Sequence, residues 1–323
     1  MALLSEAGAM RWAVPQAFGG TGWAPLQLYL GYEVIAGASL AVALILSQRD
    51  SAVGLLESAL PSPFAAELLG KLADDSIFAT IGIAQLTTSR QSGPPALRAT
   101  ASDDGWWLDG MIPWATGAGR ADWVIAGATA DDGRQLLIAL TTAAPGVEVQ
   151  PPLPLVALRA SWTGQITCRA VRIEPEMVLR GPMEKVLAGR KNTLPLGQVF
   201  LATGLCRAGL DLISEHRSAG ARTAHGRFEA QLGELRTEIL ALCQPGREAD
   251  ATSAAARLRG QCSELALRIV HAAVALYKGA ALLADHPAQR LAREAMFLLV
   301  WSCPSPVIDC TVDLLSDPRL AQS

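Results

Sequence analysis

The chain has 323 residues, of which 50% are hydrophobic and 18% are charged, and this balance excludes a disordered or fibrous protein. Its formal net charge is -3, and no cluster of lysine and arginine appears, so the sequence argues against a nucleic-acid partner. A chain of this length can bury a large core and form two or three structural units.

The cysteines and the apolar runs indicate a soluble protein of a reducing compartment. None of the six cysteines forms a Cys-x-x-Cys pair, so their spacing predicts neither a zinc site nor a disulfide framework. The early apolar run from Val34 to Leu46 is too short to span a bilayer. The first residues lack the basic start and cleavage pattern of a signal peptide. We therefore expect a cytoplasmic protein with no metal and no membrane partner.

Residues 1–78 are predicted to form a helical domain. A helix is expected from Ala7 to Phe18, where Gly19-Gly20-Thr21-Gly22 must end it. Pro25 suits the first turn of a helix running towards Leu46. Two more helices are expected, from Ser51 to Leu60 and from Pro63 to near Leu72.

Residues 79–180 change character and predict a small β-barrel or sandwich. In the stretch from Ala99 to Ala128, acidic-Gly and Gly-rich turns stand between runs of aromatic and β-branched residues, which is a hairpin signal. Short strands with regular turns continue on both sides. The expected strands are Ile77–Leu86, Leu97–Ala101, Trp106–Asp109, Trp123–Ala128, Gln135–Leu140, Val147–Gln150 and Gln165–Ile173.

Residues 181–323 return to helical spacing. No proline interrupts Leu196 to Gln244 or Gly246 to His286, so two long antiparallel helices of a bundle are expected. A further helix is expected from Pro287 to Trp301, and a last one near Val307 to Leu315. The fold class is thus α+β and mainly α, with domains at 1–78, 79–180 and 181–323.

Six segments contain recognisable motifs: Val14–Gly22, Gln85–Ser89, Gly110–Asp122, Thr163–Leu179, Arg222–Arg227 and His286–Ala295. Each motif is weak alone, but their order and the order of the three blocks resemble the acyl-CoA dehydrogenase family over nearly the whole chain. The first helices of the family have no counterpart here, so one wall of the substrate cleft is expected to be more open.

The resemblance implies a bound FAD and names the residues that would hold it. Thr87, in the motif that begins at Gln85, and Thr116 would hydrogen-bond the isoalloxazine edge, and Trp114 would pack beside the ring. Arg222, with His225 one turn further on, would meet the pyrophosphate of the flavin of a neighbouring subunit. The same residues also fit ordinary roles as strand-end threonines, a core tryptophan and a solvated arginine.

The sequence departs from the family at the catalytic base. Counting from Arg293-Glu294-Ala295, the family's glutamate falls on Ser302, whose hydroxyl cannot act as an unassisted base near neutral pH. The second base position known in relatives lies between Asn192 and Thr203, which hold no carboxylate. The family's substrate-binding Gly-Ser-Asp is replaced by Gln91-Ser92-Gly93.

Nearby reactive residues have simpler interpretations. Cys303 follows Ser302 at a helix end, where a thiol pKa is raised rather than lowered, so an inert thiol is expected. Glu294 is expected in an ion pair, and His286-Pro287 is expected to start a helix. His225 replaces a phenylalanine of the family motif and fits a packing role better than a proton shuttle.

Three functions remain open from the sequence. The first is an FAD-dependent oxidoreductase acting on an acyl thioester or a related small molecule through a non-standard base, with an electron-transfer flavoprotein as partner. The second is a flavin-dependent monooxygenase supplied by a flavin reductase. The third is a catalytically silent binding or assembly subunit. The resemblance implies a homodimer or a homotetramer.

Overall fold

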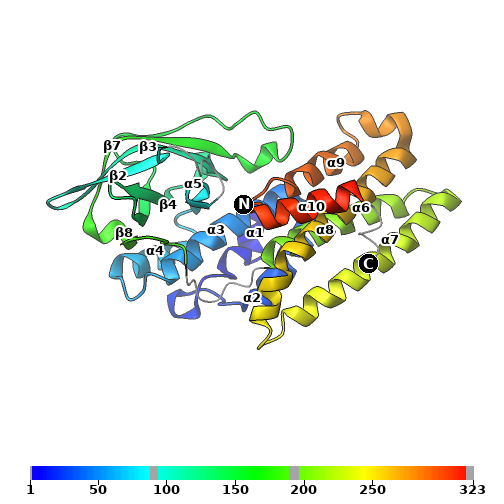
Figure 1. The fold of residues 1–323 in the computed structure, drawn as a ribbon, viewed down its shortest axis with the longest axis horizontal. Coiled ribbons are helices and arrows are strands. Elements are labelled where there is room, and N and C mark those ends of the chain that lie inside the picture. The colour runs from blue at the N-terminus through cyan, green and yellow to red at the C-terminus, as the bar shows by residue number, and fades with distance from the viewer. Residues whose placement is uncertain (1, 88–93, 189–195, 318–323) are drawn as a thin grey trace. The chain divides into compact units, whose positions relative to one another are not determined.

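The computed structural model describes residues 2–87, 94–188 and 196–317 (Figure 1). It confirms a mixed fold that is mainly helical. The chain forms two compact units. The first contains Met1–Ala24, Leu44–Pro154 and Arg159–Asn192, and the second contains Pro25–Ala43, Leu155–Leu158 and Thr193–Ser323.

The first unit begins with short turns, so the helix expected from Ala7 to Phe18 is wrong. A short helix α1 (Ala2–Glu6) is followed by two 3-10 turns, η1 (Ala9–Arg11) and η2 (Gln16–Phe18). Gly8 has a φ of 71° and Pro15 stands just before η2, and both interrupt an α-helix. The glycine turn is confirmed, because Gly19 and Gly22 have positive φ values of 89° and 63°.

Three helices follow, with boundaries that differ partly from the prediction. They are α2 (Pro25–Ala38), α3 (Leu40–Glu57) and α4 (Pro63–Ala73). The expected helix ends early because the hydroxyl of Ser39 accepts from the backbone nitrogen of Val42 (3.4 Å) and caps α3. The start expected at Ser51 is wrong, because Ser51 lies inside α3 and its hydroxyl donates to the carbonyl of Ser47 (2.8 Å).

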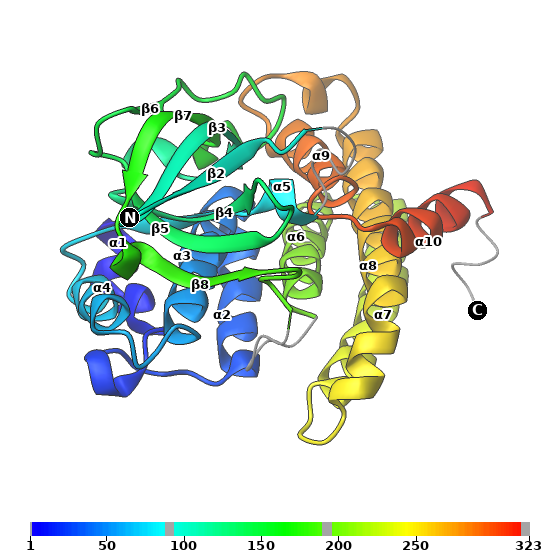
Figure 2. The same cartoon turned by 60° about the vertical axis from the view of Figure 1, so that its left-hand side comes forward.

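The strands form one mixed eight-stranded sheet, in the order β6-β7-β3-β2-β4-β5-β8 with β1 paired to β4 (Figure 2). The strands are β1 (Ala79–Gly82), β2 (Leu97–Ser102), β3 (Gly105–Ala115), β4 (Trp123–Ala130), β5 (Gln135–Thr141), β6 (Val147–Val149), β7 (Gly164–Ile173) and β8 (Val178–Met183). Short helical turns connect them: α5 (Ala84–Thr87), η3 (Ala118–Arg120), η4 (Arg159–Ser161) and η5 (Pro175–Met177).

Three strand predictions need correction. The first expected strand ends at Gly82, and its remainder forms α5. The turn at Gly105 joins β2 to β3, whereas β3 and β4, which carry the two aromatic runs, are not paired with each other. Strand β8 was not predicted.

Alternation along the central strands builds two cores in the first unit. In β5, Leu136, Ile138 and Leu140 belong to a cluster shared by β2, β3, β4 and β7. Leu137 and Ala139 point to the opposite face and pack with residues of α3 and α4. Both faces of the central strands are therefore buried.

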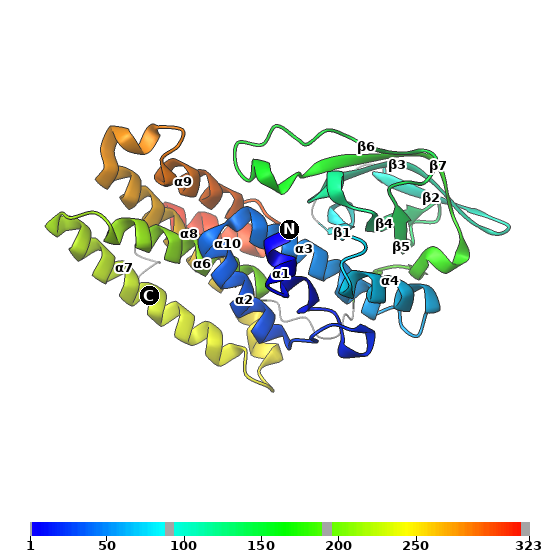
Figure 3. The ribbon, with the colours of Figure 1, turned by 180° about the vertical axis from the view of Figure 1, so that it is seen from behind.

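The second unit is a helical bundle in which α6 (Gly197–Ser214), α7 (Ala219–Leu242) and α8 (Glu248–Tyr277) run side by side (Figures 1 and 3). It continues with η6 (Lys278–Leu282), α9 (Pro287–Leu298) and α10 (Ser305–Ser316). The helix expected from Leu196 to Gln244 is two helices, because the Ser218 hydroxyl accepts from the backbone nitrogen of Ala221 (3.1 Å) and starts α7.

Helix α8 is the central helix of this bundle. Residues Glu248–Leu282 are long and apolar enough to cross a membrane by length and composition, with a mean hydropathy of 1.4. Helix α8 contacts α6, α7, α9 and α10, and 33% of its apolar window is buried in the structure. The cysteines are free thiols: Cys168, Cys206, Cys243 and Cys262 are buried, and Cys303 and Cys310 are half-buried.

Candidate functional site

In the first unit, Gln85 holds the short helix that carries Thr87. The Gln85 side-chain amide donates to the carbonyl oxygens of Gly82 (2.9 Å) and Gly127 (2.7 Å), which ties α5 to β1 and β4. These two acceptors fix the amide orientation, and the buried Oε1 atom of Gln85 has no hydrogen-bond partner among the residues that the structure describes. Thr87 is exposed at the end of α5. The structure therefore gives Gln85 a positioning contact and leaves Thr87 accessible.

Trp114 lies at the end of β3 and Thr116 directly after it, and α5 also contacts this strand. The Trp114 side chain is 45% exposed, so it is not the core aromatic that a purely structural role would require. The backbone carbonyl of Thr116 accepts from the hydroxyl of Thr80 (2.7 Å). Its own hydroxyl lies 3.2 Å from that of Thr163. The exposed Trp114 therefore lies two residues from a threonine whose hydroxyl contacts Thr163 and whose backbone carbonyl contacts Thr80.

The hydroxyl of Thr163, which contacts that of Thr116, also contacts a buried serine. Thr163 Oγ1 lies 2.8 Å from the hydroxyl of Ser161, which is fully buried. Between them Trp162 has a positive φ of 52° and an exposed ring, with the guanidinium of Arg120 5.6 Å from the ring centroid. Sequence reasoning missed these residues as site candidates. The available signal was a Ser-x-Thr pair immediately before a strand.

In the second unit, Arg222 and His225 lie three residues apart near the start of α7 and share one face of the helix. Arg222 is exposed, and its guanidinium donates to the carbonyl of Arg217 (2.9 Å). Among the described residues no carboxylate pairs with Arg222. The N-terminal end of a helix repels cations and attracts anions, so an unpaired arginine there suits an anionic group.

Ser302 lies in the loop between α9 and α10, and Arg259 of α8 holds that loop. The Arg259 guanidinium donates to the carbonyl oxygens of Trp301 (2.8 Å) and Ser302 (3.0 Å). Ser302 is exposed and has a positive φ of 48°. Burial lowers the pKa of Arg259 below its ordinary value. The backbone of the predicted base position is thus clamped, although its side chain carries no base.

The neighbours of Ser302 have the structural roles expected from the sequence. Burial raises the pKa of the Cys303 thiol despite the guanidinium of Arg259, so the thiol is predominantly protonated at neutral pH. Glu294 pairs with Arg290 at 3.1 Å, as predicted. His286 caps α9 by accepting from the backbone nitrogen of Ala288 (3.1 Å), which confirms the helix start at His286-Pro287.

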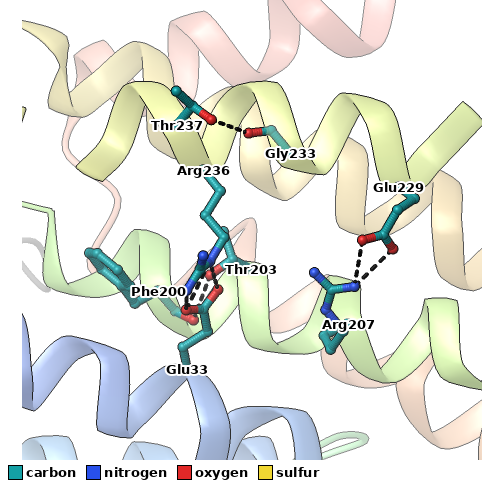
Figure 4. Close-up of polar contacts among 8 residues, drawn as sticks. All are labelled: Glu33, Phe200, Thr203, Arg207, Glu229, Gly233, Arg236 and Thr237. Atoms are coloured by element: carbon teal, nitrogen blue, oxygen red, sulfur yellow. Dashed lines mark hydrogen bonds and ion pairs between the residues drawn. The ribbon is translucent and has the colours of Figure 1, made fainter. Parts of the chain in front are cut away.

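Ion pairs join α2, α6 and α7 in the second unit (Figure 4). Glu33 of α2 accepts two hydrogen bonds from the Nε of Arg236 (3.0 and 3.2 Å) and one from its Nη2 (3.0 Å). Arg207 of α6 pairs with Glu229 of α7 at 2.8 Å. These contacts fix α7, the helix that carries Arg222 and His225.

Gln85, Thr87, Trp114 and Thr116 all lie in the first unit, and Arg222 and His225 lie in the second unit on one face of α7. Thr88, Ser89 and Gln91–Gly93 lie outside the described residues, as does Asn192 at the second base position. Within the described ranges, no group of three or more His, Cys, Asp or Glu residues could hold a metal ion.

Comparisons with known proteins return acyl-CoA dehydrogenases and a monooxygenase among other matches. No protein-family model matches the chain. A probable acyl-CoA dehydrogenase of Bacillus subtilis is 24% identical over 320 residues, which cover 91% of this chain and 83% of that protein. The structure of a glutaryl-CoA dehydrogenase from Mycobacterium smegmatis in complex with FADH2 superposes with a TM-score of 0.79 at 18% identity, covering 98% of this chain and 86% of that one.

A second solved structure is similar to the same extent. FMN-bound TdsC from Paenibacillus sp. A11-2 superposes with a TM-score of 0.83 at 16% identity, covering 97% of this chain and 89% of that one. TdsC is a dibenzothiophene monooxygenase. Each of these matches spans nearly the whole of this chain.

Proposed function

The chain has the acyl-CoA dehydrogenase fold and resembles that family along its length, and from this premise we propose that it is an FAD-dependent oxidoreductase. Its substrate is an acyl thioester or a related small molecule. The observation that carries the proposal is the end of β3, where the exposed Trp114 stands two residues from the fixed hydroxyl of Thr116. Neither side chain is buried in the hydrophobic core of the first unit.

The residues present fit the two ends of FAD. An isoalloxazine needs an apolar wall at its face and hydrogen-bonding groups at its polar edge, which Trp114, Thr116 and Thr87 would supply. Thr163 and Thr80 would hold Thr116 in place, since they contact it from both sides. Arg222 would bind the pyrophosphate as a planar cation with several donors. When bound, FAD supplies the redox centre that accepts a hydride.

Ser302 favours a second candidate, a flavin-dependent monooxygenase. An α,β-dehydrogenation needs a carboxylate to remove a proton, and Ser302 presents an exposed hydroxyl at that position. Oxygen chemistry on this fold does not require that carboxylate, and the likeness to TdsC, at a TM-score of 0.83, is compatible with it. This function would require reduced flavin from a partner reductase.

The first test is the absorbance spectrum of the purified protein, with and without added FAD, followed by anaerobic addition of acyl-CoAs. Bound flavin that bleaches supports the oxidoreductase. Bound flavin that no acyl-CoA reduces, but that a chemical reductant such as dithionite reduces and oxygen then reoxidises with incorporation of an oxygen atom into an added substrate, supports the monooxygenase. A chain that binds no flavin contradicts both and leaves the silent binding subunit.

The Thr116 contact can be tested by FAD affinity, which does not depend on turnover. We expect Thr116→Val to raise the dissociation constant of FAD about fivefold, since one hydrogen bond is worth about 1 kcal/mol. Thr163→Val should act in the same direction through the position of Thr116. Thr100→Val, at an exposed position of β2, is the matched control. Equal FAD affinities in all three variants would remove Thr116 from the flavin site.

A further inference from the structure

Trp162 of the first unit is held with its indole ring at the surface. The ring is 44% exposed, and the residue has a positive φ of 52°. This backbone conformation is unfavourable for a bulky side chain and persists only where neighbouring contacts hold it. The hydroxyls of Ser161 and Thr163 lie 2.8 Å apart, and the Ser161 carbonyl accepts from the backbone nitrogen of Gly117 (2.9 Å). The two residues on either side of the ring are therefore fixed, and they hold it at the surface.

The ring of Trp162 lies against the 3-10 turn η3. A Cβ atom on Gly119 would lie 2.9 Å from Cε3 of Trp162, so the ring is close to the glycine backbone. The guanidinium of Arg120 lies 5.6 Å from the ring centroid, within the range of a cation–π contact. Tryptophan and arginine are enriched among the residues that dominate the energy of protein interfaces. An exposed pair of these two residues on a fixed backbone therefore suits contact with another protein.

The chain around this pair is positively charged. Residues 110–121 and 149–173 contain four arginines and no aspartate or glutamate. Two of these arginines form ion pairs with carboxylates of neighbouring segments. The other two, Arg120 and Arg159, are exposed, and neither pairs with a carboxylate of the part of the chain that the structure describes. Cations without local counter-charges attract an acidic surface and repel a basic one.

This surface is adjacent to the proposed flavin site. The hydroxyl of Thr163, the residue after Trp162, lies 3.2 Å from that of Thr116. The proposed function assigns Thr116 to the edge of the isoalloxazine, so a protein that contacts Trp162 would be near the redox centre. Turnover of an oxidoreductase requires an acceptor from outside the chain, because a flavin reduced by substrate must be reoxidised.

We propose that Trp162, Arg120 and Arg159 form the docking surface for an electron-carrier protein with an acidic face. This inference rests on the proposed function and adds the chemistry of the partner. In each turnover the carrier takes up the two electrons that the substrate has given to the flavin, and the proton that came with them passes to solvent. Interfaces between redox partners are small, often below about 1,200 Å², so one aromatic anchor with two cations suits such a contact.

The charge at Trp162 can be tested without flavin, by fluorescence quenching with iodide and with caesium ions. The emission that Trp162→Phe removes reports on Trp162 alone. Relative to their quenching of free N-acetyltryptophanamide, iodide should quench this emission more than caesium does. Arg120→Glu should remove or reverse that preference, since it replaces the nearest cation with an anion. No preference for iodide in the wild-type background would overturn the charge on which the proposal depends.

Docking is tested with the FAD-loaded protein, reduced with dithionite and reoxidised by cytochrome c or by its succinylated form. The first acceptor is a basic protein, and the second is the same protein with carboxylates on its lysines. At low ionic strength, Arg120→Glu should slow reoxidation by the succinylated form about tenfold and accelerate reoxidation by the native form. Trp162→Glu should act in the same direction, and added salt should reduce both effects.

A matched variant separates this surface from the net charge of the protein. Arg134→Glu makes the same change of charge beyond the opposite end of β4, and it should leave both rates close to those of the wild type. FAD affinity is measured in every variant, so that a loss of flavin is not mistaken for a loss of docking. If FAD binds and Arg120→Glu behaves like Arg134→Glu, the docking surface is overturned and the proposed function stands. A chain that binds no FAD would overturn both.

Discussion

Two ion pairs of the helical unit differ in how far they are removed from water. The Glu33 side chain is 13% exposed and accepts three hydrogen bonds from Arg236. The Glu229 side chain, paired with Arg207, is 43% exposed. Exposed pairs contribute about 0–1 kcal/mol, whereas removing one partner of a mostly buried pair leaves a charge without its hydrogen bonds.

We expect Glu33→Ala to lower the free energy of unfolding by about 2–3 kcal/mol, because Arg236 loses its partner. Glu229→Ala, the control drawn in the same figure, should lower it by less than about 1 kcal/mol. Urea denaturation followed by circular dichroism measures both values. Similar losses in the two variants would show that the burial of Glu33 does not matter.

Glu294 makes stability depend on pH. Burial raises its pKa above the ordinary value of 4.5, although Arg290 and Arg293 oppose that shift. The unfolded chain therefore loses this proton at lower pH than the folded one. The stability that the protonated carboxyl contributes is complete below pH 4.5 and is lost as pH rises through the raised pKa.

Glu294→Gln removes this titration, so the stability of the wild type relative to the variant should fall as pH rises from about 4 to 7. Unfolding in urea at a series of pH values measures the difference. Glu67→Gln, at an exposed residue of α4, controls for the loss of a charge and should show no comparable trend. A relative stability that rises over the same range would contradict the raised pKa.

At the scale of elements, α2 and α6 approach each other closely at a glycine. A Cβ atom on Gly204 would lie 2.4 Å from the backbone oxygen of Glu33 and 2.7 Å from the Cβ of Ala36. Both contacts are shorter than real Cβ contacts, and one is to backbone. The two helices can therefore pack at this distance only with glycine at position 204.

Gly204→Ala should destabilise the protein by about 1–3 kcal/mol, although alanine is the better helix former. Gly226→Ala in α7, where a Cβ meets nothing within 4 Å, should instead stabilise it by about 0.5–1 kcal/mol. Thermal and urea unfolding of the two variants give the comparison. Stabilisation by both would mean that α2 and α6 can separate without penalty.

The type of an element could be predicted from the sequence where the residue pattern indicated only a helix or only a strand. The short apolar run from Gln135 to Leu140, which follows the turn at Asp131-Asp132-Gly133, predicted β5 closely, and Pro63 marked the start of α4. Boundaries set by single side chains were missed, since the hydroxyls of Ser39 and Ser218 cap helices that the apolar spacing alone would join. The strand order was beyond prediction, because β3 pairs with β7 across some 60 residues of chain.

Only the candidate site residues that lie within a short sequence motif could be predicted. Trp114 and Thr116 were found because they lie in one motif. Thr163 contacts Thr116 from 47 residues away, and Arg259 holds Ser302 from 43 residues away, so neither partner leaves a signal in local spacing. The identities of chemical groups can be read along the chain, whereas their partners depend on tertiary packing.

For the whole molecule, the resemblance places Arg222 at the flavin of a neighbouring subunit. We therefore expect the Arg222→Met and Thr116→Val variants each to bind FAD weakly. The first loses the contact to the flavin of the neighbouring subunit, and the second loses the contact to the flavin of its own subunit. The two variants are then mixed under conditions that exchange subunits. Each mixed dimer should contain one intact flavin site and one site with both substitutions. With random pairing about half of the dimers are mixed, so about a quarter of all sites should recover wild-type affinity. Absorbance and ultracentrifugation measure flavin bound to the assembly. No recovery after verified exchange would place Arg222 at the flavin of its own chain or outside the site.

The turn between α7 and α8 opens a practical use. Residues 244–250 are exposed, and Gly246 has a φ of 82° with free space around its Cα. Chain reversals of this kind accept added sequence, because no buried backbone group is disturbed. A fluorescent protein or an affinity peptide inserted after Pro245 should leave folding intact, giving a handle for immobilising the molecule without altering either end of the chain.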